Sequence, residues 1–217
     1  MSADTDRLVP RDFASVEAIL TDVINHWHEQ EESITDWPSA LEAIPLGRPE
    51  GWARTAERLQ LINTFQWHEE DKSRDHGADD AILAGTKRSI DASNRRRVQN
   101  IDALDDLIFT GLKEAGLLKD GAQLNSESPG SIIDRLTVLA LKVYHVEEAL
   151  AAFRAGGEDP GAMQDRLDTL TEQTRDLGAC LDRMLTGIRA GDMGLKLYRQ
   201  VKVYREPGTG RLVADLD

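Results

Sequence analysis

Apolar residues recur at alternating steps of three and four along most of this chain, which is the spacing of one face of an α-helix. Phe13, Val16, Leu20, Val23 and Trp27 form the first such stripe, and they predict a helix over about 12–31. Further helices are predicted over about 52–74, 79–112 and 129–154, with a last one from about Met163 to Ile188. The dominant pattern is therefore helical.

The fourth helix has the clearest start, because Ser128 is a good N-cap and Pro129 suits the first helical position. Its sequence is almost continuously apolar from Leu136 to Leu141, which indicates that neighbours cover it on two faces. The chain is thus predicted to be an all-α, single-domain bundle of about five to six helices over 1–217, with a central buried helix at about 129–154.

The chain ends and the first long connection lack this periodicity. Residues 1–11 are predicted to be flexible, 33–51 to form an extended connection rich in Pro and Gly, and 205–217 to be an irregular tail. The stretch 195–204 fits either a further helix or one strand of a hairpin, and the helix is favoured.

Composition narrows the classes of function. The net charge of -13 over 217 residues repels phosphate backbones and argues against nucleic-acid binding. The single cysteine, Cys180, excludes an internal disulfide and an all-Cys zinc site. No apolar run is long enough for membrane insertion and no signal peptide is recognisable, so we expect a cytoplasmic protein. The motifs of nucleotide-binding folds and of serine hydrolases are also missing.

Polar residues interrupt the apolar stripe of the third predicted helix. Its spacing places Lys87, Asn94 and Arg97 at positions that would otherwise be core. Burying unpaired charges costs several kcal/mol, so these side chains either line a cavity for an anionic ligand or lie where the stripe faces solvent.

Two predicted helices each carry a histidine followed three residues later by a carboxylate. The pairs are His68 with Asp71, and His145 with Glu148. At this spacing the carboxylate can orient the imidazole as an acid/base group or join it in binding a cation. The alternatives are a core histidine satisfied by a neighbour and, for His68, a solvated helix end. If a divalent or transition metal binds, its expected ligands are His68, Glu70, Asp71, His145 and Glu148.

The entry to the fourth helix offers backbone amides and hydroxyl groups. Ser128, Ser131 and Arg135 surround this helix start, which is a place where proteins bind anions. An ordinary Ser-Pro cap closed by its own side chains explains the same residues.

Three stretches together resemble a bacterial family catalogued as domain of unknown function 4254. They are Trp67 to Arg74, Lys87 to Asn94 and Asn125 to Glu148, and the likeness extends from about Leu59 to Tyr204. The resemblance implies an all-helical fold. Because such proteins are often encoded beside glycosyltransferases, it also implies a sugar or nucleotide-sugar ligand.

The resemblance also implies a set of polar site residues. In this sequence they are Asn63, His68, Glu70, Asp71, Arg74, Lys87, Arg88, Asp91, Asn94, Arg97, Asn125, Glu127, Ser131, Asp134, Arg135, Lys142 and His145. The chain departs from the family pattern at Gln60, where a histidine is expected, and at Arg95 and Arg96, which replace an amide-rich pair.

Three hypotheses follow for the function. The first is an enzyme or binding protein with a polar interhelical site for an anionic small molecule, in which His68 or His145 is the acid/base and Asp71 or Glu148 orients it. The second is a metal-dependent oxidase or hydrolase with His and carboxylate ligands. The third is a non-catalytic protein that uses the apolar seam of the last helix to form a homodimer or to bind a partner.

Overall fold

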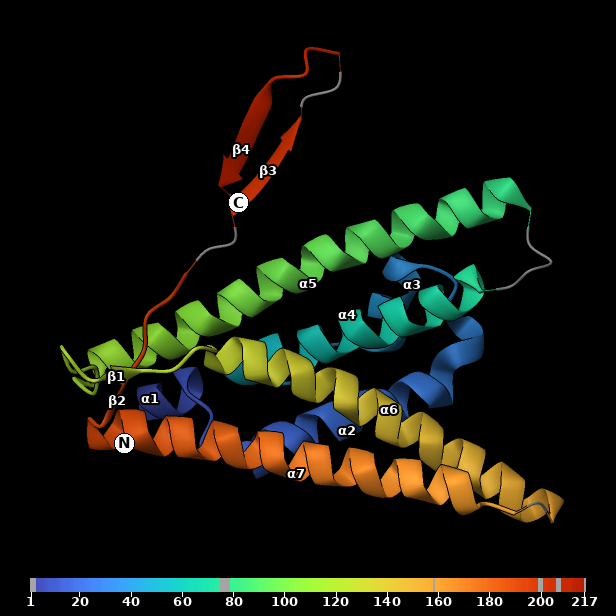
Figure 1. The fold of residues 1–217 in the computed structure, drawn as a ribbon, viewed down its shortest axis with the longest axis horizontal. Helices are drawn as coiled ribbons and strands as arrows, with labels where there is room; N and C mark the ends of the chain where they lie inside the picture. Colours follow the sequence, from blue (N-terminus) through green and yellow to red (C-terminus); the bar gives the residue numbers. More distant parts are fainter. Residues whose placement is uncertain (1–2, 75–78, 158, 199–200, 206–207, 217) are drawn as a thin grey trace.

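The computed structural model describes residues 3–74, 79–157, 159–198, 201–205 and 208–216. Its helices are α1 (Ala3–Leu8), α2 (Phe13–Gln30), α3 (Trp37–Ala43), α4 (Trp52–Ser73), α5 (Asp80–Glu114), α6 (Pro129–Gly156) and α7 (Gly161–Ala190), with a short 3-10 helix at Glu31–Ser33. Figure 1 shows the long helices lying side by side. The all-α class predicted from the hydrophobic pattern is confirmed.

Local capping explains where these helices begin and end. The Asp12 side chain accepts a hydrogen bond from the Ser15 amide at the start of α2, and Ser128 caps α6 in the same way. Gly157 and Gly191 follow α6 and α7 with positive φ angles of 72° and 81°, a conformation that glycine adopts without a Cβ clash. Local sequence therefore marks the starts of α2 and α6 and the ends of α6 and α7.

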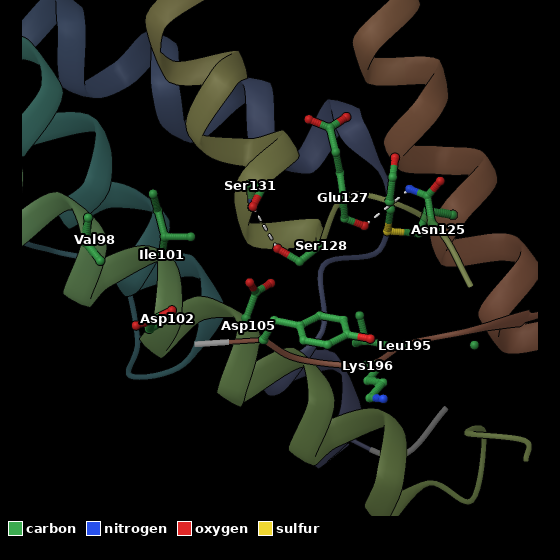
Figure 2. A pocket seen from close by; sticks show the side chains of 14 residues that line it. Val98, Ile101, Asp102, Asp105, Asn125, Glu127, Ser128, Ser131, Leu195 and Lys196 are labelled. Carbon is green, nitrogen blue, oxygen red and sulfur yellow. Dashed lines mark hydrogen bonds between the residues drawn. The ribbon is translucent and has the colours of Figure 1, made fainter. Parts of the chain in front are cut away.

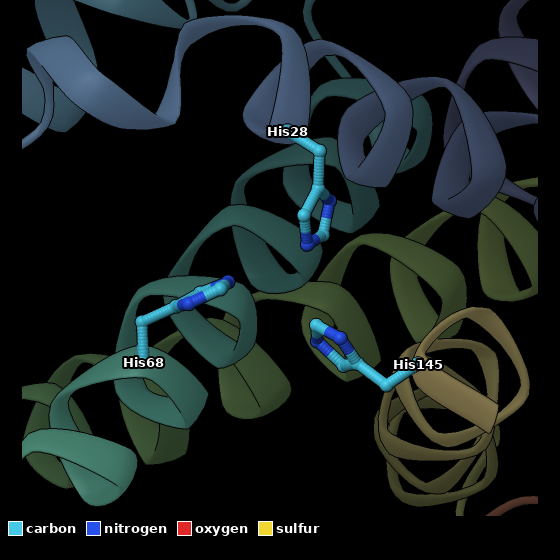
Figure 3. A group of neighbouring side chains, drawn as sticks. All are labelled: His28, His68 and His145. Carbon is cyan, nitrogen blue, oxygen red and sulfur yellow. The ribbon is translucent and has the colours of Figure 1, made fainter. Parts of the chain in front are cut away.

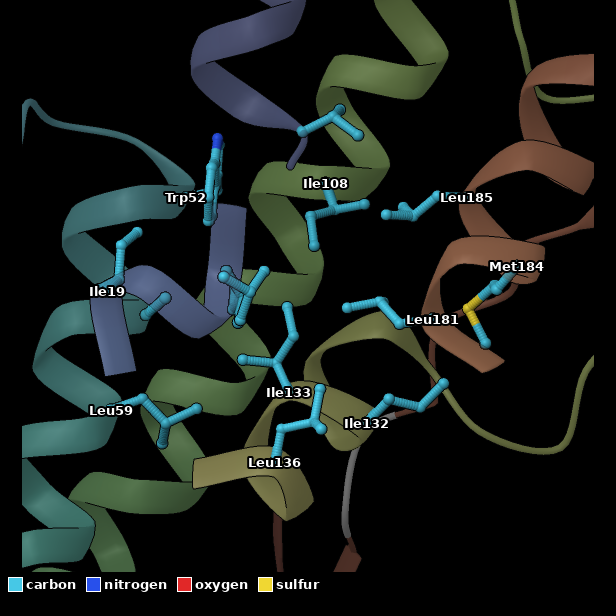
Figure 4. Packing of buried hydrophobic residues seen from close by; sticks show 14 of the residues in the cluster. Ile19, Trp52, Leu59, Ile108, Ile132, Ile133, Leu136, Leu181, Met184 and Leu185 are labelled. Carbon is cyan, nitrogen blue, oxygen red and sulfur yellow. The ribbon is translucent and has the colours of Figure 1, made fainter. Parts of the chain in front are cut away.

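One hydrophobic core joins all the long helices (Figure 4). Helix α6 packs against α2, α4, α5 and α7, which confirms the predicted central helix. In the apolar seam of α7, Leu181 and Ile188 are fully buried in this core, so the C-terminal half of the seam packs on its own chain. A second cluster lies under α3 and contains Val23, Trp27, Ala40, Ile44, Leu61 and Phe65.

The structure differs from the sequence predictions at the two ends and in the first connection. Within the stretch 1–11, expected to be flexible, Ala3–Leu8 form α1, and Leu8 and Val9 are buried in the core, whereas residues 1–2 lie outside the described residues. The connection 33–51 contains α3, whose start is fixed by reciprocal hydrogen bonds between Asp36 and Ser39. In both cases a short helix escapes prediction because it spans too few turns to show periodicity.

Within the described residues, 195–198 are irregular and 201–204 belong to a strand, so the helix favoured for 195–204 is wrong there, and 199–200 lie outside the described residues. Strand β3 (Val201–Arg205) pairs antiparallel with β4 (Leu212–Leu216), which is the hairpin alternative. Positions 206–207 and 217 of the predicted tail lie outside the described residues. A two-residue parallel pair, β1 (Gln123–Leu124) with β2 (Met193–Gly194), ties the loop before α6 to the end of α7. Among the described helices, none has the length and apolar composition that crossing a membrane requires.

Candidate metal centre

Three histidines from three different helices meet between α2, α4 and α6 (Figure 3). His28, His68 and His145 each offer one ring nitrogen, and these three atoms lie within 4.8 Å of one another. Within the described part of the chain, no other group of three His, Cys, Asp or Glu side chains converges in this way.

Neighbouring tryptophans direct two of these histidines. Trp27 is 2% exposed and packs against Phe65 in the second cluster. Successive residues of a helix project about 100° apart, so burying Trp27 turns His28 toward α6. On α4, the Trp67 ring stacks on His145 while His68 points at the other two histidines. The three rings thus meet because the helices bury their apolar stripes.

Each imidazole is held through its Nδ1 atom. His28 Nδ1 donates to the Ile24 carbonyl oxygen at 2.8 Å, which is the backbone group one turn earlier. His68 Nδ1 lies 3.2 Å from Glu31 Oε1, and His145 Nδ1 lies 3.1 Å from Glu148 Oε2. An acceptor at Nδ1 fixes the tautomer in which Nε2 carries a lone pair, and metal-binding histidines are typically oriented in this way.

The three Nε2 atoms are buried and have no hydrogen-bond partner among the described residues. A buried polar atom without a partner costs free energy, so three of them in one place are unfavourable in a purely structural cluster. A cation bound to all three lone pairs would satisfy them together.

Aromatic rings enclose the cluster. Trp27 stacks on His68 with ring centroids 5.1 Å apart, and Trp67 stacks on His145 at 5.2 Å. Tyr144 stacks on His28 at 4.1 Å. These contacts restrict rotation of all three imidazoles, so the ligand set is preorganised.

Burial also sets the protonation state of one histidine. Burial, together with the proximity of His28 and His145, lowers the pKa of His68 to about 4. His68 is therefore neutral at physiological pH and its lone pair is available to a metal.

We expect the metal-free protein to lose stability as the pH falls from about 6.5 to about 4. Above this window His68 is neutral in both the folded and the unfolded protein, and below it the imidazole is protonated in both. In between, the unfolded chain binds a proton that the folded chain excludes, because burial of the imidazole, together with His28, His145 and Lys72, opposes protonation more than Asp71 favours it.

Urea unfolding in the presence of a chelator, at pH 7.5 and at pH 5, measures this loss of stability. The variant His68→Gln has no imidazole at this position and is expected to lose less stability between the two pH values. An equal loss in both proteins would contradict the assignment to His68.

Other predicted metal ligands lie away from the three nitrogens. Asp71 forms an ion pair with Arg74, and Glu70 accepts a hydrogen bond from Gln66 Nε2 at 2.9 Å. Glu148 contacts His145 through Nδ1 rather than joining the convergent atoms. His68 is paired with Glu31 and not with the Asp71 carboxylate one turn later.

Sequence reasoning missed His28 and Glu31. A signal was present, because Glu31 follows His28 by three residues, the same spacing as in the other two His–carboxylate pairs. In the structure Glu31 crosses to His68 on α4, a contact between helices that spacing along one helix does not reveal.

A second polar network joins α4, α5 and α6. Arg97 donates from Nε and Nη2 to the two carboxylate oxygens of Asp134 at 2.7 and 2.6 Å. Asn63 Nδ2 donates to Asp134 at 3.0 Å and to Thr137 at 2.6 Å. The structure therefore brings three of the predicted polar residues into one partly buried cluster: Asn63, Arg97 and Asp134.

Other polar positions of α5 face outward. Lys87 forms an ion pair with Asp91 one turn later on the same helix, and Lys87, Arg88 and Asn94 are exposed. These three side chains thus lie where the stripe leaves the core.

The entry to α6 borders a cavity of about 400 Å³ (Figure 2). Asn125, Glu127 and Ser131 line it together with Asp102 and Asp105. Gly130 N donates to Asp105 Oδ1 at 2.7 Å, and Ser131 N donates to Ser128 Oγ at 3.2 Å. These amides are already bonded and carboxylates face the cavity, so the arrangement supports a helix cap more than an anion site.

A larger cavity has a volume of about 620 Å³ and is lined by three of the cationic residues that were predicted to bind an anion. They are Arg97, Arg135 and Lys142. Arg97 is bonded to Asp134, and Arg135 Nη1 donates to both oxygens of Glu127 at 2.8 and 2.9 Å. Lys142 makes no ion pair within the described residues.

Comparison with known proteins yields one family. The model of a family described as protein of unknown function (DUF4254) matches residues 53–197. His68 and His145 lie inside the matched region, whereas His28 precedes it. Neither a curated protein nor a solved structure matches the chain.

Proposed function

The chain belongs to the family described as protein of unknown function (DUF4254), and we propose that it is a metal-dependent hydrolase in which His28, His68 and His145 bind one divalent transition-metal ion. Two observations carry the proposal: one ring nitrogen from each histidine converges on the same place, and all three Nε2 atoms are buried without a partner among the described residues, while each Nδ1 lies next to an oxygen atom.

The geometry suits zinc in particular. Zn–N bonds are about 2.0–2.1 Å, so three nitrogens on one tetrahedral ion lie roughly 3.4 Å apart. Ring nitrogens that are already within 4.8 Å of one another reach this distance by small movements of the side chains. Three protein ligands leave a fourth coordination position for water or substrate, as in catalytic zinc sites.

The ligand set favours hydrolytic over oxidative chemistry. Three imidazole ligands would leave the full charge of a divalent ion, which would lower the pKa of bound water toward 7 and so supply a nucleophile. Non-haem iron oxygenases instead use two histidines and one carboxylate, and the carboxylates near this cluster contact the Nδ1 atoms. We therefore propose a metal-dependent hydrolase rather than a metal-dependent oxidase.

Zinc stoichiometry tests the proposal. Protein stripped with a chelator and then dialysed against a slight excess of Zn²⁺ is expected to retain one ion per chain in native mass spectrometry. Retention of no ion would overturn the proposal, and so would retention that the triple variant His28→Ala, His68→Ala, His145→Ala leaves unchanged.

The Glu148 carboxylate, which contacts His145 Nδ1, should raise the affinity of the site for the metal. Replacing Glu148 with alanine removes the acceptor at 3.1 Å from His145 Nδ1, and loss of such an outer partner costs about 10–100-fold in affinity. We expect about tenfold, because the Glu148 side chain is 54% exposed. Competition with a chromophoric chelator measures the change.

Glu147→Ala is the matched control for this variant. It removes the same charge at the adjacent exposed position of α6 without touching His145. Equal losses in the two variants would point to a general charge effect and contradict the role given to Glu148.

An anionic ligand remains a second candidate, supported by the cavity that Arg97, Arg135 and Lys142 line. Two of these cations are already paired inside the chain, so the observation supports binding through Lys142 more than through a cluster of three free charges.

A further inference from the structure

A cleft lies beside His145 on the side of α7. This cleft has a volume of about 560 Å³ and lies between α6 and α7, which run side by side in Figure 1. Its apolar lining consists of Trp67, Val146, Ala149, Met163 and Leu170. A volume in this range accommodates a small organic molecule.

The cleft shares residues with the candidate metal centre. His145 lines it, and Trp67, which lines it as well, stacks on the His145 ring with an interplanar angle of 10°. A molecule bound in the cleft therefore contacts a ring that belongs to the ligand set. A substrate bound in the cleft would lie beside one of the three proposed ligands.

The charges on the cleft favour an anion. Lys142 and Arg166 line it, and neither makes an ion pair within the part of the chain that the structure describes. Among the described residues of the lining, Asp165 is the one carboxylate, so the cleft has two cations and one acidic side chain. This excess is local, because the whole chain carries a net charge of -13.

We propose that the cleft binds an amphipathic anion, with its apolar part against Trp67, Met163 and Leu170 and its carboxylate, phosphate or sulfonate group at Lys142 and Arg166. Its identification as the substrate class rests on the proposed metal-dependent function. The binding itself rests on the shape, apolar lining and unpaired cations of the cleft.

Two fluorescent probes separate the apolar and the ionic contributions. Anilinonaphthalene sulfonate is an apolar anion, and N-phenylnaphthylamine has the same aromatic rings without the sulfonate. Titrating each into the metal-free protein is expected to give about tenfold tighter binding of the anion, since two partly exposed ion pairs together contribute roughly this factor.

Two cleft variants assign the preference to residues. In Lys142→Ala, Arg166→Ala the two probes are expected to bind within about twofold of each other, whereas the control Lys87→Ala, Arg88→Ala, at exposed positions of α5, keeps the tenfold preference. Ala149→Trp fills the cleft and is expected to abolish binding of both probes while the circular dichroism spectrum stays unchanged. If Ala149→Trp alters that spectrum, the paired comparison in Lys142→Ala, Arg166→Ala decides the assignment.

Equal affinities of the two probes for the unmodified protein would overturn the proposal, and so would an intact preference in the double variant Lys142→Ala, Arg166→Ala. A dimer in sedimentation that Ala149→Trp dissociates would also overturn it, because a second copy would then occupy the cleft.

Failure of the metal function is distinguishable from failure of anion binding. If the anion preference behaves as expected but zinc does not bind, anion binding in the cleft is supported, whereas the proposal that this anion is the substrate of a metal enzyme is wrong.

Discussion

Replacing His28 with alanine is expected to lower the affinity for Zn²⁺ by at least about 100-fold. This loss is larger than the loss caused by removing a residue that only hydrogen-bonds to a ligand. The variant leaves two imidazoles, and two neutral ligands hold a divalent ion far less tightly than three. A chelator competition assay on the purified protein measures the dissociation constant.

His26 offers a matched control on the same helix. It is exposed, and its Nδ1 bonds to the Asp22 carbonyl oxygen in the same local geometry as His28 to Ile24. His26→Ala is expected to bind zinc like the unmodified protein. If the two variants lose affinity equally, His28 is not a ligand and the three-histidine centre is wrong.

Replacing Asp134 with alanine is expected to lower the free energy of unfolding by about 3 kcal/mol. The side chain of Asp134 is 9% exposed and accepts hydrogen bonds from Arg97 and Asn63. Its removal leaves a half-buried guanidinium and a buried amide without their partner, and an uncompensated charge of this kind is strongly destabilising. Urea denaturation gives the difference.

Asp91→Ala removes a carboxylate of the same size from an exposed pair. Asp91 pairs with Lys87 at the i, i+4 spacing on α5, where such pairs contribute about 0.3–0.5 kcal/mol. The loss for Asp134→Ala is therefore expected to exceed that for Asp91→Ala several-fold. Comparable losses would show that the network between α4, α5 and α6 is only a surface arrangement.

Local signals made most of the helices predictable from the sequence. Ser128 and Pro129 mark the start of α6, and the three-four spacing of apolar residues marks the long helices. The short elements escaped prediction because their signals are weaker than those of a long stripe. Helix α1 was missed although Leu8 and Val9 are buried, since the contacts that order it come from α5 and α4.

The site was predictable only in part, for a geometric reason. Spacing along α6 identified the contact between His145 and Glu148, because both residues belong to one helix. The partner of His68 is Glu31, close to the end of α2, and the third histidine also comes from α2. Such convergence depends on how helices pack against each other, which periodicity along a single helix does not contain.

X-ray absorption spectroscopy of the zinc-loaded protein tests the central claim most directly, because it reports the atoms bound to the ion. We expect three nitrogen ligands with imidazole scattering at about 2.0–2.1 Å and one further light atom. A shell made only of oxygen ligands, or fewer than three imidazoles per zinc, would contradict a metal centre formed by His28, His68 and His145.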